Sequence, residues 1–509
     1  MGIKFGIRRS FGRFARDERG ALTAFTAVCF LLMFGAVGMG VDFMRQETRR
    51  AELQAAIDNA VLAAASLREG GEPKVVVKDM LSAAGYDPDA IGLDVQSQVD
   101  GATRRVSVSA RTQMPTYFLK VVGFGGMDVV ASATATETAS NLEISLVLDI
   151  STSMAIYRTG TNDEMRLDVM KREAVRFLTG LLEGQGRENI SVTVVPFAGQ
   201  VNLGPIARNY FRKKNRHDYT ACLEFEPDDF TRFRLPNQRS RDQMVHFSHY
   251  DWWNDPEMAD IRHVIGYGWC PSDDSRVLYQ SNSLEKLTNH INGLKTHEAT
   301  GSQYGMRWGL GLLHPDTRPL MFRSILAGDT PFRFFRRPVR VGTPGTEKII
   351  VYMSDGDTTG QYRIVDKKYP GGRVRDADLD DPTDLTTIDN VLEMLGPKPR
   401  WQDVWALVPA GNVEYSADGQ YTDIDGEFMH RTRTVQEARA DFANICQVAK
   451  DEGITVFTIG FDVQDGSNAE TDLAACASSA GHFFDVHGDA LGDAFDQIGV
   501  SITRLRLTS

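Results

Sequence analysis

The chain has 509 residues, of which 42% are hydrophobic and 24% are charged, and its formal net charge is −12. This composition is ordinary for a globular protein, and the length suits two to four domains, or one domain with large insertions. Proteins that bind nucleic acids carry a basic surface. The acidic balance therefore argues against a nucleic-acid partner.

The two ends of the chain differ in charge. The first twenty residues hold six Lys or Arg and two Asp or Glu, a net charge of +4, which leaves −16 for the rest. Residues 21–41 (ALTAFTAVCFLLMFGAVGMGV) then follow without a charge, up to Asp42. A helix of this length crosses about 30 Å of hydrocarbon. Because basic residues stay on the cytoplasmic side, we expect 1–20 to be a cytoplasmic tip, Ala21 to Val41 to span the membrane and the remainder to lie outside.

A cleaved signal peptide is the alternative reading of this segment. Its apolar run is longer than the 7–15 residues typical of signal peptides, and no clear A-x-A cleavage site follows. We therefore favour a retained anchor.

Five cysteines are present, and Cys29 lies inside the apolar run. The other four allow three pairings on the outer side, where disulfides persist. We favour Cys446–Cys476 and Cys222–Cys270, because each pair falls within one segment of the chain.

Residues 42–140 predict a helical stalk and a small α+β module. Gln46–Leu67 repeats apolar residues at helical spacing, so this stalk (42–69) packs either on another helix or on its own neighbouring module. A short helix over Lys74–Ala84 and three alternating strands should form that module (70–140). The expected strands are Gly92–Val99, Arg104–Arg111 and Val129–Thr138.

From residue 141 onward, apolar strands alternate with amphipathic helices, which predicts a doubly wound, mainly parallel α/β sheet. The expected strands are Leu142–Leu148, Ile190–Phe197, Lys348–Met353, Ile454–Phe461 and His482–Val486. The expected helices are Asp163–Leu182, Gln303–Leu313, Val435–Asp451, Thr471–Ser479 and Ala490–Leu505. Two segments, about 202–294 and 361–432, interrupt the alternation and read as insertions on this domain (141–509).

Three pieces of sequence place oxygen ligands at strand or helix ends. Asp149, Ser151 and Ser153 follow the first strand, Thr300 precedes a helix, and Asp355 follows the strand over Lys348–Met353. Loops at the carboxyl ends of parallel strands meet at one edge of a sheet. Three hydroxyls and two carboxylates suit Mg²⁺, with Ca²⁺ or Mn²⁺ as alternatives. Neutral hydroxyl ligands leave the ion electrophilic enough to accept a carboxylate from a partner, and no nucleophile with an orienting base accompanies the set, so we expect binding rather than catalysis.

In this order, the motif resembles the metal-ion-dependent adhesion site of the von Willebrand factor A family. The resemblance implies that Ser151, Ser153 and Thr300 coordinate the ion directly, and that Asp149 and Asp355 act largely through water. Other motifs resemble TadG-type proteins of tight-adherence (Tad/Flp) pilus assembly. They are Gly-Val-Asp42 at the end of the span, Leu53-Gln-Ala-Ala-Ile-Asp58-Asn-Ala, Val195-Pro-Phe197, Gly305-Met-Arg-Trp308-Gly309 and the Cys446…Cys476 pair. The related pilins carry Glu five residues after a cleavage Gly, whereas Phe25 stands five residues after Gly20, so this resemblance does not extend to prepilin processing.

Other residues that could bind a metal or a partner are expected to have a structural role instead. His246 and His249 lack a third ligand, and His297-Glu298 lacks the second His of a zinc-protease motif. Asp357 reads as a turn residue, and Trp252-Trp253 as part of the core of an insertion. The acidic run from Asp376 to Asp381 lacks the Gly and Glu of a calcium loop.

These observations favour a bacterial inner-membrane protein with a single span, whose periplasmic bulk binds a pilus or envelope protein through a divalent metal. The alternative is a structural envelope protein whose metal site only stabilises the domain. A hydrolase, the third reading, would need a general base beside the metal.

Overall fold

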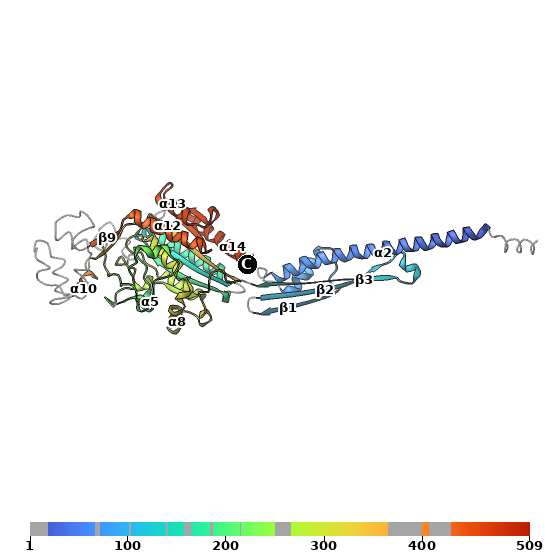
Figure 1. Ribbon diagram of the computed structural model, residues 1–509, viewed down its shortest axis with the longest axis horizontal. Helices are drawn as coiled ribbons and strands as arrows, with labels where there is room; N and C mark the ends of the chain where they lie inside the picture. The colour runs from blue at the N-terminus through green and yellow to red at the C-terminus, as the bar shows by residue number, and fades with distance from the viewer. Residues whose placement is uncertain are drawn as a thin grey trace, which may run out of the picture. The chain divides into compact units, whose positions relative to one another are not determined.

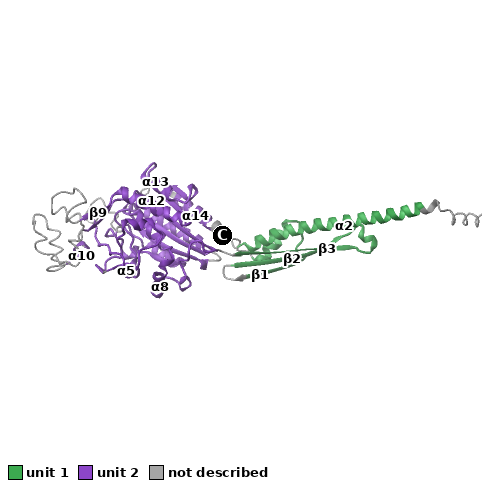
Figure 2. Ribbon diagram, in the orientation of Figure 1, with its two compact units in different colours: residues 1–138 green, residues 139–509 purple. Residues whose placement is uncertain are grey.

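The structure is a computed structural model. It describes residues 19–66, 72–100, 103–138, 141–156, 164–183, 187–213, 215–249, 266–364, 400–406 and 429–508. The chain forms two compact units, residues 1–138 and 139–509, which are coloured separately in Figure 2. Each unit is described by itself below, with the elements labelled as in Figure 1.

The first unit is one long helix packed on a small sheet. Helix α2 (Arg19–Ala65) runs without a break from the apolar segment into the stalk, and α3 (Pro73–Ala83) follows it. Strands β1 (Gly92–Asp100), β2 (Thr103–Pro115) and β3 (Gly126–Thr138) form an antiparallel sheet in the order β1-β2-β3. Among the described residues, α2 is the one helix long and apolar enough to cross a membrane.

The C-terminal half of α2 packs on its own module. Leu53, Ile57, Ala60 and Val61 are buried against α3 and against one face of the sheet. They recur at i, i+4, i+7 and i+8, so that they lie on one side of the helix. The sequence left open whether the stalk packs on another helix or on its own neighbouring module. In the structure it packs on the module.

The second unit is built on a six-stranded sheet. The strands, in spatial order, are β11 (Phe483–Val486), β10 (Thr455–Phe461), β7 (Thr346–Ser354), β4 (Asn141–Asp149), β5 (Ile190–Phe197) and β6 (Leu278–Ser281). All neighbours are parallel except β5 and β6. The expected α/β fold class, a mainly parallel sheet wound on both faces, is confirmed.

Helices cover both faces of this sheet. Successive side chains of a strand point to opposite sides, and both sides of these strands are apolar, so each face packs against helices. Leu146 and Leu148 of β4 belong to one apolar core and Val147 belongs to the other. The first core includes helices α4 (Arg166–Leu182), α6 (Leu284–Asn292) and α14 (Leu491–Thr508). The second includes α5 (Gly204–Phe211), α7 (Ser302–Gly311), α8 (Arg318–Leu326), α12 (Val435–Asp451) and α13 (Asn468–Cys476).

The described parts of the two long insertions share a third core. Trp269 and Cys270 of the first insertion pack with Trp401 and Trp405 of the second, which lie on α10 (Trp401–Trp405). The second insertion begins and ends in a two-stranded sheet, β8 (Gln361–Ile364) with β9 (Met429–Arg433). The favoured disulfides, Cys222–Cys270 and Cys446–Cys476, are both present.

Several expected boundaries differ from the structure. The helix expected at Thr471–Ser479 begins at Asn468, because Ser467 caps it by accepting a hydrogen bond from the Glu470 amide. The edge strand β6 was not expected. Its sequence, LYQS, is short and carries no apolar run. The Asp376–Asp381 run and the Trp252-Trp253 pair lie outside the described residues.

Candidate functional site

The carboxyl ends of two neighbouring strands bring four of the five expected ligands together. Asp149 is the last residue of β4, Asp355 follows β7, and these strands are parallel neighbours. The Ser151 amide donates to Asp149 Oδ1 over 2.8 Å, and Ser153 Oγ donates to Asp355 Oδ1 over 2.7 Å. The two serine hydroxyl oxygens are 2.8 Å apart. Asp149, Ser151, Ser153 and Asp355 thus form one hydrogen-bonded group.

Ser354 holds Asp149 from the neighbouring strand. Its hydroxyl donates to Asp149 Oδ2 over 2.5 Å. Both oxygens of Asp149 therefore have a partner, and the carboxylate cannot turn away without breaking a buried hydrogen bond. Ser354 directly precedes Asp355 in the sequence Ser-Asp-Gly, but the strand-end pattern did not single it out.

Thr300 reaches this edge of the sheet through its backbone. Its amide donates to Thr359 Oγ1 over 3.0 Å, and its carbonyl accepts from the Thr359 amide over 2.9 Å. The next residue, Gly301, donates to the Ala198 carbonyl beyond β5. A Cβ at Gly301 would lie 2.4 Å from the Gly199 carbonyl oxygen, so this close approach of two chains requires glycine. Within the described residues, the Thr300 hydroxyl is not part of the hydrogen-bonded group of the other four.

The two carboxylates are buried close together. Asp149 is inaccessible to solvent and Asp355 is 5% exposed. Burial, together with the negative charge of Asp355, raises the pKa of Asp149 to about 7, against hydrogen bonds from Ser354 and Ser151 that lower it. Burial also raises the pKa of Asp355, while Arg166 and Ser153 lower it. A cation between these groups would favour their charged forms.

Arg166 also belongs to this site, although its position in the sequence did not indicate this. Its Nη1 lies 2.9 Å from Asp355 Oδ2, and its Nε lies 3.5 Å from Asp462 Oδ2. Arg166 begins α4, where an arginine in a sequence such as Met-Arg-Leu reads as an ordinary exposed helix residue.

Asp462 extends the site to a third strand. It follows the end of β10 with a positive φ of 53°, and its carboxylate accepts from the Gly488 amide over 2.9 Å. Its place after a strand, like that of Asp149 and Asp355, is a signal that could have identified it. His487 Nδ1 lies 3.7 Å from Asp462, and Asp465 and Asp485 gather around the other ring nitrogen of His487. Because Asp465, Asp485 and His487 are exposed, we assign them no ligand.

The donor set fits a hard divalent cation. Each hydroxyl and carboxylate oxygen of the group is a ligand type that Mg²⁺ accepts, and nitrogen or sulfur atoms do not contribute. Ser153 donates its hydroxyl hydrogen to Asp355 and so keeps its lone pairs available for an ion. Ser151 and Ser153 would hold the ion directly, and Asp149 and Asp355 would supply negative charge around it.

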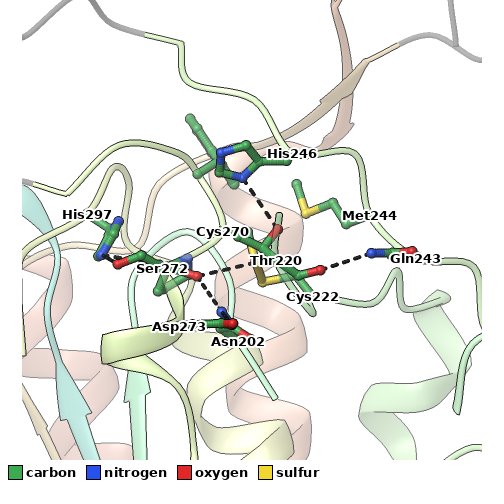
Figure 3. The surroundings of a disulfide bond; sticks show 12 residues. Asn202, Thr220, Cys222, Gln243, Met244, His246, Cys270, Ser272, Asp273 and His297 are labelled. Atoms are coloured by element: carbon green, nitrogen blue, oxygen red, sulfur yellow. Dashed lines mark hydrogen bonds between the residues drawn. A yellow bond between two sulfur atoms is a disulfide. The ribbon is translucent and has the colours of Figure 1, made fainter. Parts of the chain in front are cut away.

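The weaker candidates have structural partners. Burial lowers the pKa of His246 to about 3, and its Nδ1 is 3.4 Å from the Thr220 hydroxyl, near the Cys222–Cys270 disulfide (Figure 3). His297 is fully buried, with Nε2 3.2 Å from the Ser272 hydroxyl. Glu298 accepts from the His249 amide over 2.6 Å.

Asp357 also has a structural partner. Its Oδ1 accepts from the Ala469 amide over 2.6 Å, at the first turn of α13. A carboxylate at this position satisfies a helix amide that has no partner within the helix. Asp357 therefore acts as a capping residue in the structure.

Comparisons with known proteins concern different parts of the chain. Residues 20–67 match the Tad family model, described as Flp pilus-assembly TadE/G-like. No functionally curated protein is detectably similar to the chain.

Among solved structures, the vWF domain of the type V pili tip protein Mfa5 from Porphyromonas gingivalis is 18% identical, with a TM-score of 0.34. That likeness covers 72% of this chain and 97% of the domain. A three-domain structure of Mfa5 is 16% identical with a TM-score of 0.33, covering 81% of this chain and 56% of that one. The pilus adhesin SpaC from Lactobacillus rhamnosus GG is 12% identical with a TM-score of 0.31, covering 83% of this chain and 35% of SpaC.

These TM-scores are too low to transfer a function, so the fold class rests on the strand order of the sheet. The apolar helix at the N-terminus fits single-pass membrane anchoring. The chain thus resembles Tad pilus-assembly proteins of the TadE/G-like kind over residues 20–67, and it carries a larger unit with the α/β fold expected for a von Willebrand factor A domain.

Proposed function

We propose that this protein is a membrane-anchored component of pilus assembly or surface adhesion that captures a protein partner through a divalent cation. The observation that carries the proposal is the buried oxygen group at the carboxyl edge of the sheet. It places two carboxylates and two hydroxyls in one hydrogen-bonded cluster, beside the guanidinium of Arg166. With both carboxylates charged, the cluster has one more negative charge than Arg166 balances, so a divalent ion would stabilise its charged form.

The ion would serve recognition. Mg²⁺ prefers six oxygen ligands and keeps water where the protein offers fewer. A carboxylate from a partner would replace one of these waters. The insertions support this role, because the first follows β5 and the second follows β7, at the same edge of the sheet as the oxygen group. The two insertions, held together by their shared core, would form the surface that selects the partner.

The pilus assignment is supported by the N-terminal segment. Residues 20–67 match the Tad family model, and they coincide with α2 almost from end to end. The basic tip would remain in the cytoplasm, with the disulfide-bonded unit on the periplasmic side of a bacterial inner membrane. A pilus or envelope protein on that side would supply the carboxylate.

The test is calorimetric titration of Mg²⁺ into the full-length protein in nanodiscs. Ser151→Ala removes one hydroxyl and should weaken Mg²⁺ binding by about tenfold or more. Ser191→Ala is the matched control, because this buried serine lies at the opposite end of the sheet, where it contacts Leu142 and Arg337. Equal Mg²⁺ affinity in the wild type and Ser151→Ala would contradict the proposal.

A structural role is the second candidate, and Arg166 favours it. In the structure this guanidinium already pairs with Asp355, so the site has a cation of its own. This reading predicts that Ser151→Ala lowers thermal stability and leaves capture of a partner unchanged, and that capture is the same with and without Mg²⁺. Capture is measured by comparing pull-downs in Mg²⁺ and in EDTA.

A further inference from the structure

The connection between β2 and β3 lies against the apolar part of α2. It includes the 3₁₀ helix η1 (Leu119–Val122) and, in Figure 1, it forms the end of the sheet that lies beside the middle of α2. The other end of the β-sheet packs near the C-terminal part of the same helix through Ala60, Val61 and Ala64. The β2–β3 loop, residues 116–125, is therefore the part of the module nearest to the span.

Asp42 fixes this loop to the helix. It is completely buried, and its carboxylate accepts three backbone hydrogen bonds, from Tyr117 over 3.0 Å and from Phe118 and Leu119 over 2.8 Å each. Charge-assisted bonds of this kind are stronger than neutral ones. The first charged residue after the apolar run is thus used to hold the loop at the end of the span.

Arg45 adds a second attachment one turn further along α2. Its guanidinium carbon lies 4.1 Å from the centre of the Tyr117 ring, and its Nη1 donates to the Pro115 carbonyl over 3.4 Å. Gln46 donates to the Asp128 carbonyl over 2.8 Å. Both ends of the loop are therefore bound to the same short stretch of helix.

Phe118 places the loop beside the last turns of the apolar run. Its ring centre is 5.8 Å from that of Phe34, and a Cβ on Gly38 would lie 2.4 Å from its Cδ1. At 1.5 Å per residue, Gly38 and Phe34 lie about 5 and 10 Å inside the end of the apolar run at Val41. A side chain packed on both of them is at the depth of the lipid chains whenever α2 crosses a bilayer.

The rest of the loop exposes apolar side chains at this position. Val121 is 86% exposed and Val122, Phe124 and Tyr117 are each 64–66% exposed. The neighbouring helix side chains Val37 and Phe43 are also exposed, at 68% and 54%. In water such a patch would be unfavourable, whereas in a membrane interface each apolar group contributes to insertion.

We propose that the β2–β3 loop is a second membrane contact, which inserts its apolar tip into the leaflet next to the module. Tyr117, Arg45 and Lys120 would lie at the level of the headgroups, where aromatic and basic side chains are favoured. The module would then be held upright on the membrane surface by two attachments, the span and the loop. The proposal rests on α2 crossing a membrane, and it holds for either orientation of the span.

Lipid quenching of a site-specific fluorophore tests the proposal. The full-length protein carrying Cys29→Ser receives one labelled cysteine, at Val121, Leu62 or Val28, and is placed in nanodiscs that contain nitroxide lipids. Leu62 is 64% exposed on α2 but lies about 30 Å beyond Val41, so it reports an exposed apolar position outside the membrane. Val28, in the span, reports whether α2 crosses the bilayer.

The expected result is that the Val121 probe loses about half of its fluorescence to a shallow nitroxide, as befits a group about 5–10 Å below the headgroup boundary. The Leu62 probe should be almost unaffected. Equal quenching at Val121 and Leu62, with strong quenching at Val28, would overturn the loop insertion and leave the anchor intact. An unquenched Val28 probe would overturn both.

Two glycines of the span provide a matched pair of variants. Gly38→Ala places a methyl group against Phe118, whereas Gly35→Ala meets no atom within 4 Å. We expect Gly38→Ala to reduce quenching of the Val121 probe by about half, since the loop must move away from the helix to admit the methyl group. Gly35→Ala should leave it unchanged, and the same loss in both variants would contradict the role of the Phe118 contact.

Discussion

Arg166 Nη1 lies 2.9 Å from Asp355 Oδ2, so the first residue of α4 neutralises the acidic residue that follows β7. The same guanidinium points its Nε at Asp462, beyond β10. Three segments that are distant in the sequence are thus held together at the candidate metal site by one side chain. Arg166 competes with any metal ion for the charge of Asp355.

Removal of this guanidinium should make the site bind Mg²⁺ more tightly. Repulsion between two like charges a few ångströms apart is on the order of 1–4 kcal/mol, so Arg166→Gln is expected to raise the Mg²⁺ affinity by about tenfold. In EDTA the same variant should be less stable by about 1–3 kcal/mol, because Asp355 loses its partner. Calorimetry measures the Mg²⁺ affinity, and chemical denaturation measures the stability.

Arg172→Gln, on the exposed side of α4, is the control. Weaker Mg²⁺ binding in Arg166→Gln would contradict this prediction, because it would show that the guanidinium helps to hold the ion.

The metal-free protein should lose stability as the pH rises toward 7. The folded state holds a proton on Asp149 up to about pH 7, whereas the unfolded chain releases it near pH 3.8. Between these values the folded state binds more protons, so the free energy of unfolding falls with increasing pH. Denaturation in EDTA at pH 5 and pH 8 should show a decrease about 2 kcal/mol larger in the wild type than in Asp149→Asn.

Saturating Mg²⁺ should remove that difference, since a bound ion favours both charged carboxylates. Protons compete with the ion, and the apparent Mg²⁺ affinity should therefore fall as the pH drops below about 7. An affinity that is constant from pH 5 to pH 8 would mean that the ion does not bind beside Asp149.

Gly301→Ala should separate the Thr300 segment from the loop after β5. The added Cβ would lie 2.4 Å from a backbone oxygen of Gly199, and such a clash costs about 1–3 kcal/mol. We expect lower stability, by thermal unfolding, and weaker Mg²⁺ binding. Gly180→Ala, inside α4 with no atom within 4 Å, should instead stabilise the protein by about 0.5–1 kcal/mol.

The Cys446–Cys476 disulfide should stabilise the larger unit. It joins α12 to α13 across 30 residues of sequence. Closing a loop of this size contributes about 3–4 kcal/mol through the unfolded state. The double variant Cys446→Ser/Cys476→Ser should lower the melting temperature, while Cys29→Ser should not change it. Equal melting temperatures would show that strain in the folded state offsets the gain.

The sequence predicts the sheet well where strands are buried on both faces. Ile190–Phe197 is bounded as expected, because a continuous run of Val and Ile fits a strand between two helical layers. Strand β6 could not be predicted, since LYQS pairs only at the edge, with a register shift between Val192 and Val194. Edge pairing is decided by tertiary contacts rather than by local apolar pattern.

The candidate site was predictable in part for a similar reason. Asp149, Ser151, Ser153 and Asp355 lie at strand ends, where topology alone brings them together. Arg166 reaches the site from a helix, and its contact depends on the course of the chain before α4. The metal itself and its ligation by any of the five residues stay predictions. The Tad-like segment could be identified from the sequence, because its apolar run and the helical spacing of apolar residues in its stalk are local patterns.

The common core of the two insertions has an evolutionary consequence. Trp269 and Cys270 pack with Trp401 and Trp405, and the Trp269 ring nitrogen donates to Gln361 over 3.2 Å. Residues more than 90 positions apart in the chain therefore depend on one another for burial. A relative that acquired a new partner by exchanging only one insertion would expose tryptophans in the other, so the two are expected to be inherited and transplanted as a pair.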